Sequence, residues 1–381
     1  MKLREEFVLE ALEPGVNFSA LCRRYEVSRK TGYKWKLQYE NEGLVGLQNR
    51  SRRPHCSPLR VSAEVTIKVL ELRDAHRRWG PKTLHEVLSR TVSASELPSE
   101  RTIARVLERA GRIAPRKRRC DRRDEPVVRQ EVAVEGPNDL WTVDFKGWWR
   151  TKDDRRFEPL TVRDAFSRFL IGCQSLGSTK ALPVRAAFER FFEKYGLPGA
   201  ILVDNGSPFI SSHSLSGLTT LSAWWVSLGI RLVRTRPAKP QDNGGHERMH
   251  RTMAEDVEAF PASTNFEQQK QLDTWRHEFN HVRPHRALEM KTPATLYRPS
   301  TRPYHPDLVL SYDDALCVRK VSSSGTFKLH GEVHFLSHAL RGQLVGLRRH
   351  GHESCEVWFA DHYLGLVSPG RRKVAPLEHP V

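Results

Sequence analysis

Residues 141–145 read Trp-Thr-Val-Asp-Phe and residues 200–204 read Ala-Ile-Leu-Val-Asp, and these two stretches decide the fold. Apolar and polar side chains alternate in the first, so a β-strand there points Thr142 and Asp144 away from the face that carries the aromatic side chains. The second is a continuous apolar run that ends in Asp204, which is typical of a strand buried on both faces. Together they predict an α/β domain with an acidic site at its strands.

Further strands and helices surround these two stretches. Short apolar runs predict strands over residues 157–163, 169–174 and 230–234. Apolar side chains at helical spacing predict helices over residues 184–195, the second half of 211–228, 245–257 and 266–279. Five strands with intervening helices predict an α/β core with a mixed five-stranded sheet over residues 136–300.

The first fifty residues have the pattern of a helix-turn-helix. A helix-like run at residues 18–25 is followed by a turn and by Ser28, whose side chain can cap a second helix over residues 29–39. In this motif the second helix lies in the DNA major groove. We therefore predict a DNA-binding domain at residues 1–50, with base and phosphate contacts from Arg29, Lys30, Thr31, Lys34 and Lys36.

A second helical module is expected at residues 61–111, after a polar linker at 51–60. Its last helix starts after Ser99, has apolar side chains at i, i+3, i+4 and i+7, and stops at Gly111. The pattern predicts a second helix-turn-helix, in which Arg101 and Arg105 would contact DNA.

The charge distribution indicates a polyanionic partner. Of 381 residues, 62 are Lys or Arg and 45 are Asp or Glu, a formal net charge of +17. Residues 1–135 hold 29 Lys and Arg against 19 Asp and Glu, so the excess is concentrated ahead of the α/β core. Such a charge suits nucleic acid better than a small neutral substrate. Residues 112–135 form a basic linker that we expect to follow DNA phosphates through Arg116, Lys117, Arg118 and Arg119.

The rest of the chain points to a cytoplasmic, multidomain protein. Residues 301–381 alternate short apolar runs with Gly, Ser and His turns, which predicts a small all-β, barrel-like domain. The six cysteines form no Cys-x-x-Cys pair, which favours a reducing compartment. The longest uncharged stretch, residues 205–230, is too rich in Ser, Thr, Gly and His for a membrane span. We expect no membrane association.

Three acids stand at distinctive places: Asp144 on a strand, Asp204 at the end of a buried strand, and Glu247 near the start of a helix. Carboxylates that lie together repel one another and need a compensating cation. Hard oxygen ligands favour Mg²⁺ or Mn²⁺ over zinc, and two such ions can hold the attacking and leaving oxygens of a phosphoryl transfer.

Four segments resemble the motifs of one family. Three of them carry the acids and are similar to the acid-bearing motifs of the integrase core in insertion-sequence transposases and retroviral integrases: residues 141–145, residues 203–209 (Val-Asp-Asn-Gly-Ser-Pro-Phe) and residues 240–248 (Pro-Gln-Asp-Asn-Gly-Gly-His-Glu-Arg). A fourth, residues 280–288 (Asn-His-Val-Arg-Pro-His-Arg-Ala-Leu), resembles the segment that closes this core in bacterial transposases. The chain is identified on these motifs as a member of the DDE-type transposases, whose helical modules also precede the core.

The resemblance implies an RNase H-like fold and a transposase activity. Asp144, Asp204 and Glu247 would ligate two Mg²⁺ or Mn²⁺ ions; water would be the nucleophile in cleavage and the freed 3′-hydroxyl the nucleophile in joining to target DNA. The partners implied are double-stranded DNA, as the terminal inverted repeats of the element and as the target, and a second copy of the chain. We expect at least a dimer on DNA.

The spacing of the acids departs from many relatives. Asp204 and Glu247 are 43 positions apart, and the Ser-rich residues 211–220 are where we place the extra length. Asp242 and Glu255 are the alternative third acids. Basic side chains near the third motif are expected to bind DNA phosphates, Arg251 because it shares the helix face of Glu247. The others are Lys180, Arg231, Arg234, Arg236 and Lys239.

Other interpretations remain open from the sequence. Residues 246–250 also fit the His-Glu-x-x-His pattern of zinc proteases, although the surrounding glycines and arginines do not suit such a helix. A DNA-binding regulator with an inactive core is the second alternative. The pairs Trp148-Trp149 and Trp224-Trp225 are expected to pack in the core. His281 and His285 are expected to shape the closing segment rather than to bind metal.

Overall fold

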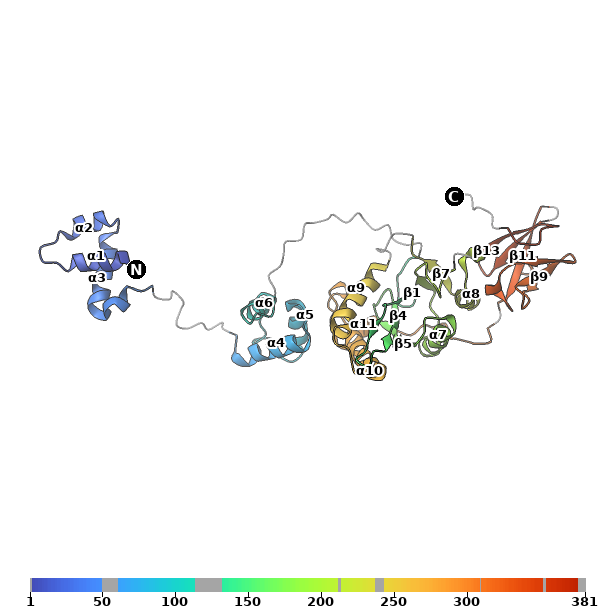
Figure 1. Cartoon of the computed structure of the whole chain (residues 1–381), viewed down its shortest axis with the longest axis horizontal. Coiled ribbons are helices and arrows are strands. Elements are labelled where there is room, and N and C mark those ends of the chain that lie inside the picture. The colour runs from blue at the N-terminus through green and yellow to red at the C-terminus, as the bar shows by residue number, and fades with distance from the viewer. Residues whose placement is uncertain are drawn as a thin grey trace. The chain divides into compact units, whose positions relative to one another are not determined.

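The structure, a computed structural model, describes residues 2–49, 61–113, 132–211, 214–236, 243–308, 310–351 and 354–375 (Figure 1). The chain divides into two compact units, Met1–Val61 and Ser62–Val381. Within the described ranges, no helix is both long enough and apolar enough to cross a membrane.

The first unit is a small helical domain. It contains α1 (Lys2–Ala11), α2 (Phe18–Arg24), α3 (Arg29–Glu42) and a 3-10 turn at Gly43–Leu47. The Ser28 side chain accepts a hydrogen bond from the Thr31 N–H (3.1 Å), so the predicted cap is confirmed, and α3 runs three residues beyond its expected end. The α1 helix was not predicted as an element. It supplies Phe7, which is fully buried and packs edge-on against three aromatic rings of α2, α3 and the intervening turn.

The second unit begins with three more helices: α4 (Ala63–Ala75), α5 (Pro81–Leu88) and α6 (Glu100–Arg109). The Ser99 hydroxyl accepts a hydrogen bond from the Thr102 N–H (3.3 Å) at the start of α6. Ile103 and Leu107 are fully buried, as the helical spacing predicts. The caps and the buried stripe follow directly from the sequence pattern.

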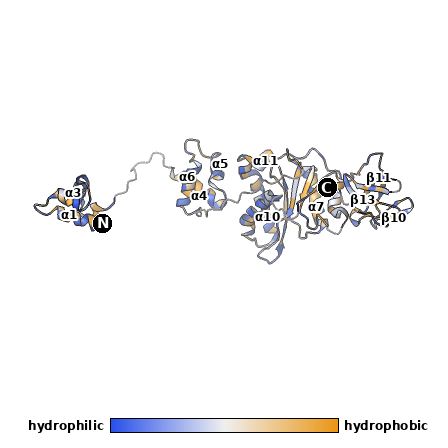
Figure 2. Ribbon diagram, turned by 90° about the horizontal axis from the view of Figure 1, so that it is seen from above, coloured by the Kyte–Doolittle hydropathy of each residue, from blue (hydrophilic) through white to orange (hydrophobic). Residues whose placement is uncertain are grey.

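A mixed five-stranded sheet forms the centre of the unit, in the order β5-β4-β1-β6-β7. The strands are β1 (Leu140–Phe145), β4 (Pro159–Asp164), β5 (Leu170–Ser175), β6 (Ala200–Val203) and β7 (Arg231–Arg234). The β1 strand is antiparallel to β4 and parallel to β6, and β6 is parallel to β7. The predicted mixed sheet is confirmed, and its central strands are among the apolar, orange parts of the ribbon in Figure 2.

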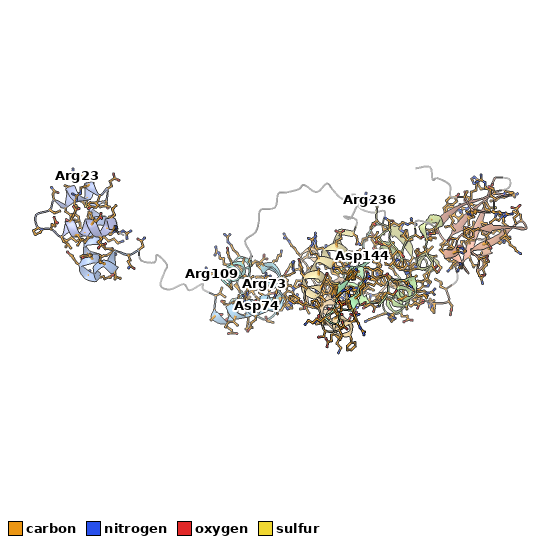
Figure 3. All side chains as sticks on the ribbon, viewed as in Figure 1. Arg23, Arg73, Asp74, Arg109, Asp144 and Arg236 are labelled. Carbon is orange, nitrogen blue, oxygen red and sulfur yellow. The ribbon has the colours of Figure 1, made fainter. Side chains whose placement is uncertain are left out.

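Helices cover both faces of this sheet. The α7 (Ala181–Tyr195) and α8 (Thr220–Ser227) helices lie on one face and share an apolar cluster with Trp141, Val143, Leu160 and Val162. The other face carries Asp144 (Figure 3) and is covered by α9 (Gly244–Met253) and α10 (Asn265–His277), which pack with β5 in a second cluster. The alternation predicted for residues 141–145 is therefore confirmed.

Both covering helices on the acidic face end in a π-helical turn. The α9 helix continues into Ala254–Glu258 and α10 into Glu278–Val282, where regular helix was expected from the sequence. Asn280, in the second of these turns, accepts a hydrogen bond from the Leu170 N–H (2.8 Å) and donates one to the Leu170 carbonyl (3.1 Å). This pairing anchors the closing segment, which ends with α11 (Pro293–Leu296), to strand β5.

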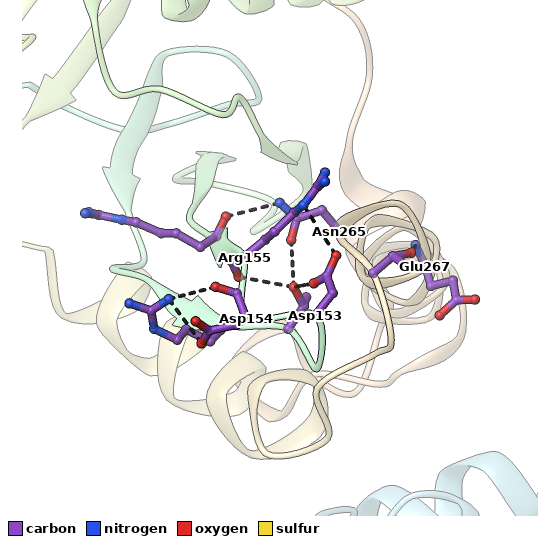
Figure 4. A network of polar contacts seen from close by, with 9 residues as sticks. Asp153, Asp154, Arg155, Asn265 and Glu267 are labelled. Atoms are coloured by element: carbon purple, nitrogen blue, oxygen red, sulfur yellow. Dashed lines mark hydrogen bonds and ion pairs between the residues drawn. The ribbon is translucent and has the colours of Figure 1, made fainter.

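A short hairpin, β2 (Trp149–Arg150) and β3 (Arg156–Phe157), joins β1 to β4. The Thr151 hydroxyl lies 2.6 Å from an Asp153 carboxylate oxygen and 2.9 Å from the Asn265 side-chain oxygen, which ties the hairpin to the start of α10 (Figure 4).

The predicted packing of the tryptophan pairs holds for three of the four side chains. Trp149, Trp224 and Trp225 are buried. Trp148 is 51% exposed, so the expectation that it packs in the core is wrong. Its ring instead lies beside the guanidinium groups of Arg150 and Arg156.

The last part of the chain consists of antiparallel strands. A four-stranded sheet in the order β13-β12-β11-β8 and a two-stranded sheet β10-β9 share one apolar cluster. The strands are β8 (Cys317–Lys320), β9 (Thr326–Leu329), β10 (Glu332–Phe335), β11 (Leu344–His350), β12 (Ser354–Phe359) and β13 (His362–Val367). Leu218, Ala223 and Val226, in and just before α8, belong to the same cluster, so this all-β part packs on the α/β core.

Candidate active site

The acidic site is centred on Asp144, near the carboxyl end of β1. Burial is the main cause that raises the pKa of Asp144 to about 7, and the charges of Asp204 and Glu247 raise it further. Because charged groups influence one another in this way only over a short range, the three predicted acids lie near one another, and their role as a metal-binding triad stays a prediction. Glu255 is absent from the groups that shift this pKa.

Asp204 and Glu247 both have exposed side chains. Asp204 directly follows β6 and is exposed, and its Oδ1 accepts a hydrogen bond from the Gly206 N–H (3.2 Å). The Asn205 side chain donates to the Thr235 carbonyl (2.9 Å), which ties this turn to the end of β7. Glu247 lies in the first turn of α9 and is also exposed. Both carboxylates are therefore open to a ligand.

A buried network of threonines and histidines fixes α9 on the sheet. The Thr161 hydroxyl, on β4, lies 2.7 Å from Nε2 of His246, 2.8 Å from Nε2 of His250 and 2.8 Å from the Asp144 carbonyl oxygen. The Thr142 hydroxyl lies 2.8 Å from Nδ1 of His246. Thr161 and His246 are both fully buried. The three histidine contacts join the helix that carries Glu247 to β1 and β4, and the Thr161 contact with the Asp144 carbonyl joins these two strands to each other.

The single hydrogen of the Thr161 hydroxyl determines which nitrogen of each histidine carries a proton. A hydroxyl has one hydrogen to donate, so Thr161 donates to the Asp144 carbonyl and accepts an N–H from each imidazole. Burial holds the pKa of His246 well below its usual value and lowers that of His250 to about 3. Both rings are therefore neutral at pH 7 and carry their hydrogen on Nε2.

This arrangement does not suit the zinc-protease interpretation. Asp144, His246 and His250 bring one ligand atom each within 4.8 Å of one another. However, both Nε2 atoms face the Thr161 hydroxyl, and Nδ1 of His246 accepts from Thr142. Of the four ring nitrogens, Nδ1 of His250 alone remains able to bind a metal ion, and it lies 3.8 Å from the Asp144 carboxylate. The histidines are used to hold the helix, whereas Glu247 points to solvent.

The alternative third acids do not join this cluster. Glu255 lies in the π-helical turn after α9 and forms an ion pair with Arg78. Asp242 lies outside the described residues. The inserted residues between Asp204 and Glu247 form a 3-10 turn at Leu215–Gly217 and a bridge between Ile210 and Leu218, ahead of α8. The extra length is thus placed to the side of the acids.

The predicted DNA-binding side chains of the helical modules are accessible. Arg29, Lys30 and Lys34 on α3 are exposed, whereas Thr31 and Lys36 are half-buried. Arg101 and Arg105 on α6 are exposed. Five predicted DNA contacts lie outside the described residues. Four belong to the basic linker (Arg116, Lys117, Arg118 and Arg119) and one, Lys239, belongs to the core. Their role stays a prediction.

The basic side chains of the core have mixed surroundings. Lys180, Arg231, Arg236 and Arg251 are exposed. The Arg234 guanidinium instead donates to the carbonyl of Ser216, in the inserted turn. A cavity of about 690 Å³ begins at Asn205, next to Asp204, and extends to residues 335–341 of the all-β part.

The closing segment is shaped by one of its two predicted histidines. His285 donates a hydrogen bond to the Phe279 carbonyl (3.2 Å), and burial lowers its pKa to about 3. His281 is exposed and stacks on His277, with ring centroids 4.8 Å apart.

Sequence reasoning missed the partners of the histidines. Thr161 and the neighbouring Arg163 lie on the same face of β4 as their cross-strand partners Asp144 and Thr142. The alternation in residues 159–164 was the available signal, but nothing local in the sequence indicates that α9 covers this face.

Comparison with known families agrees with this architecture. Two models described as integrase core domain match residues 134–240 and 228–293. A helix-turn-helix domain model matches residues 3–55, and a homeodomain-like domain model matches residues 31–107.

Similar proteins come from insertion elements and from retroviruses. The IS407 uncharacterized 31.7 kDa protein of Burkholderia multivorans is 26% identical over 253 residues, which are 66% of this chain and 87% of the relative. The IS476 uncharacterized 39.2 kDa protein of Xanthomonas euvesicatoria is 27% identical over 260 residues, 66% of this chain and 69% of the relative. Among solved structures, the HTLV-2 integrase catalytic core domain in complex with magnesium matches with 17% identity and a TM-score of 0.32, over 44% of this chain and 100% of that one. The simian T-cell lymphotropic virus intasome matches with 14% identity and a TM-score of 0.38, over 78% of this chain and 95% of that one.

Proposed function

We propose that this chain, which is similar to integrase-core proteins of insertion elements, is a DNA transposase that cleaves and joins DNA at the ends of its element in the cytoplasm. The observation that carries the proposal is that the charges of Asp204 and Glu247, which belong to separate motifs, both act on the buried Asp144. Their convergence has no structural purpose in the fold, because the cluster costs free energy through charge repulsion.

The acids have the chemistry of a divalent cation site. All three offer carboxylate oxygens, two of them exposed. Burial and, to a smaller extent, the charges of Asp204 and Glu247 raise the pKa of Asp144, and a bound cation would offset both effects. We propose that Asp144, Asp204 and Glu247 hold two Mg²⁺ or Mn²⁺ ions. Bound there, the ions supply the positive charge that activates a water or 3′-hydroxyl nucleophile and stabilises the transferring phosphate.

The chain's own residues then have distinct tasks. Thr161, His246 and Thr142 hold α9, the helix that carries Glu247, against the strands that carry Asp144 and Thr161. The exposed arginines and lysines of α3 and α6 bind the element ends, and the exposed Arg251 binds a phosphate near the acids. Two element ends must be held together for joining, so we propose a homo-oligomer, at least a dimer, on DNA.

An end-joining assay tests the proposal. Purified protein is incubated with element-end oligonucleotides, target DNA and Mg²⁺, and joined product is measured. The wild type is expected to produce it, and Asp204→Asn is expected to reduce it at least about a thousandfold, because a clamp on the transition-state charge is lost. Joining by Asp204→Asn at the wild-type rate would contradict catalysis at this site, and wild-type protein that binds but never joins DNA would be a regulator.

A matched pair of variants tests which glutamate completes the cluster. Glu247→Gln is expected to abolish joining, whereas Glu255→Gln, in the π-helical turn after α9, is expected to retain it, because Glu247 is the one of the two glutamates that influences Asp144. The opposite pattern would assign the role to Glu255. Zinc analysis of the purified protein separately tests the protease alternative, which requires one tightly bound zinc ion.

A further inference from the structure

A buried arginine without a partner lies beside the acidic site. Arg163, on β4, is only 6% exposed. Its Nε is buried without a hydrogen-bond acceptor, and no carboxylate among the described residues forms an ion pair with its guanidinium. Buried guanidinium groups are normally paired, because an unpaired buried charge is costly. The neighbouring Asp164 acts on Arg163 only through its charge, which raises the pKa of Arg163, and forms no hydrogen bond with it, since its carboxylate accepts from Asn138 and Ser167.

The Arg163 guanidinium faces the first turn of α9. Its two terminal nitrogens lie 2.6 and 2.7 Å from the position that a Cβ on Gly245 would take, so a larger residue at position 245 would displace the guanidinium. The α9 helix has ten residues, and the side chain of its N-cap residue, Asn243, makes no capping hydrogen bond. Free N–H groups and the helix dipole already make this end of the helix electropositive. A buried cation aimed at it increases the positive charge further.

Two more arginines add to the same surface. The Arg168 side chain is half-buried and the Arg248 side chain is exposed, one turn along α9. The charges of both lower the pKa of Arg163 to about 10, after the larger effect of its burial. Arg168 also has a left-handed backbone (φ 64°), which costs free energy in a residue other than glycine. No described carboxylate pairs with any of these three guanidinium groups. The cluster therefore lacks an anion.

We propose that Arg163, Arg168 and Arg248, together with the free N–H groups of the first turn of α9, bind a phosphodiester group of the DNA strand that is held at the acids. A phosphate suits the site because helix amino ends and arginines are its usual protein ligands. DNA is the source because Glu247 lies between Gly245 and Arg248, so a strand that reaches the acids passes this cluster. This assignment rests on the proposed function for its choice of DNA, and it adds to the phosphate contacts expected of Arg251 and the basic side chains that precede the third motif.

Full-length variants test the proposal in metal-free buffer with EDTA. They are Arg163→Gln, Arg248→Gln, the control Arg190→Gln, on the exposed face of α7, and Asp204→Asn. Thermal unfolding is followed by fluorescence, since Trp141 and Trp225 are buried in the core, with inorganic phosphate titrated against chloride at equal ionic strength. Binding of a DNA duplex is measured over a range of salt concentrations.

The expected pattern separates a binding site from a structural arginine. Without phosphate, Arg163→Gln unfolds at the wild-type temperature or above it, because an unpaired buried charge is gone; with phosphate, it is stabilised less than the wild type. Arg163→Gln and Arg248→Gln each bind DNA about tenfold more weakly and lower the slope of log affinity against log salt by about 1. Arg190→Gln behaves as the wild type in both assays.

Two outcomes would overturn the proposal. In the first, Arg163→Gln unfolds at a lower temperature while Arg248→Gln keeps the wild-type salt slope, so Arg163 is structural. In the second, phosphate stabilises the wild type through Arg163 but no variant changes the salt slope, so the ligand is free phosphate rather than DNA. Asp204→Asn is expected to keep the wild-type phosphate response and salt slope while it loses joining. Failure of the catalytic proposal is therefore distinguishable from failure of this one.

Discussion

The two faces of the central sheet are made by the same strands but hold opposite kinds of side chain. Toward α7 and α8, β1 and β4 present four fully buried apolar side chains: Trp141, Val143, Leu160 and Val162. Toward α9 they present polar and charged ones: Thr142, Asp144, Thr161 and Arg163. The first face gains free energy from burial, whereas the second includes groups whose burial costs free energy. The apolar face therefore stabilises the core, and the polar face is where we propose the function lies.

Phe188 on α7 offers the largest test of this division. It is fully buried and packs against Phe191, Phe192 and Trp225. Phe188→Ala is expected to lower the free energy of unfolding by about 3–5 kcal/mol, because it removes apolar contacts and leaves a cavity. Urea unfolding measures this loss. At a temperature where Phe188→Ala is still folded, the Mg²⁺ concentration that gives half-maximal joining should equal that of the wild type. Phe188→Leu is the control, and it should lose less stability than Phe188→Ala. A large shift in that concentration would mean that the faces are coupled.

The apolar face could be predicted from the sequence because each of its elements has a local signature. The alternation in residues 141–145, the stripe of α7 and the continuous run of β6 each need a buried face, whatever their neighbours are. The serine caps of α3 and α6 were equally local. The endings of α9 and α10 were not predicted, since a π-helical turn depends on packing rather than on local propensity.

The acidic face could be predicted only in part. Asp144, Asp204 and Glu247 were found through their motifs. Thr161 and Arg163 were not, because their importance arises only when α9, more than eighty residues later in the chain, lies across β4. The histidines of α9 even suggested a zinc site, and the hydroxyls that occupy their ring nitrogens become visible only in three dimensions. Local sequence identifies charged groups, but their partners come from the fold.

The variant Asp144→Asn tests how much the buried carboxylate of the acidic face lowers the stability of the protein as the pH rises. The pKa of Asp144 is raised from 3.8 to about 7 in the folded protein, so between these values the unfolded chain loses this proton while the folded one keeps it. Without metal, wild-type stability from this group is therefore present below about pH 4 and is lost as the pH rises to about 7. The total is at most about 4 kcal/mol. Denaturant unfolding in EDTA at pH values from 4 to 8 measures this effect. The free energy of unfolding of Asp144→Asn should rise relative to that of the wild type as the pH increases from 4 to 7.

Divalent cation is the control for that pH series. Mg²⁺ is expected to restore wild-type stability at pH 8 and to leave Asp144→Asn nearly unchanged, because the ion compensates the carboxylate charges. If the difference between the two proteins were the same at every pH, with or without Mg²⁺, the carboxylate of Asp144 would not be under repulsive strain in the folded protein.

Thr161 gives the smallest expected change in stability and the sharpest test of how the acidic face is ordered. Thr161→Val keeps the shape but leaves the Nε2 hydrogens of His246 and His250 without their acceptor, a loss of about 1–3 kcal/mol. Because these bonds hold the helix that carries Glu247, the variant should also need more Mg²⁺ for half-maximal joining, and Thr161→Ser should rescue both properties. A variant with lowered stability but an unchanged Mg²⁺ requirement would show that the hydroxyl only fills a buried hydrogen-bonding position. Rescue of both by serine would show instead that one hydroxyl on β4 sets where the third acid stands, so that the polar face is organised from the sheet outward.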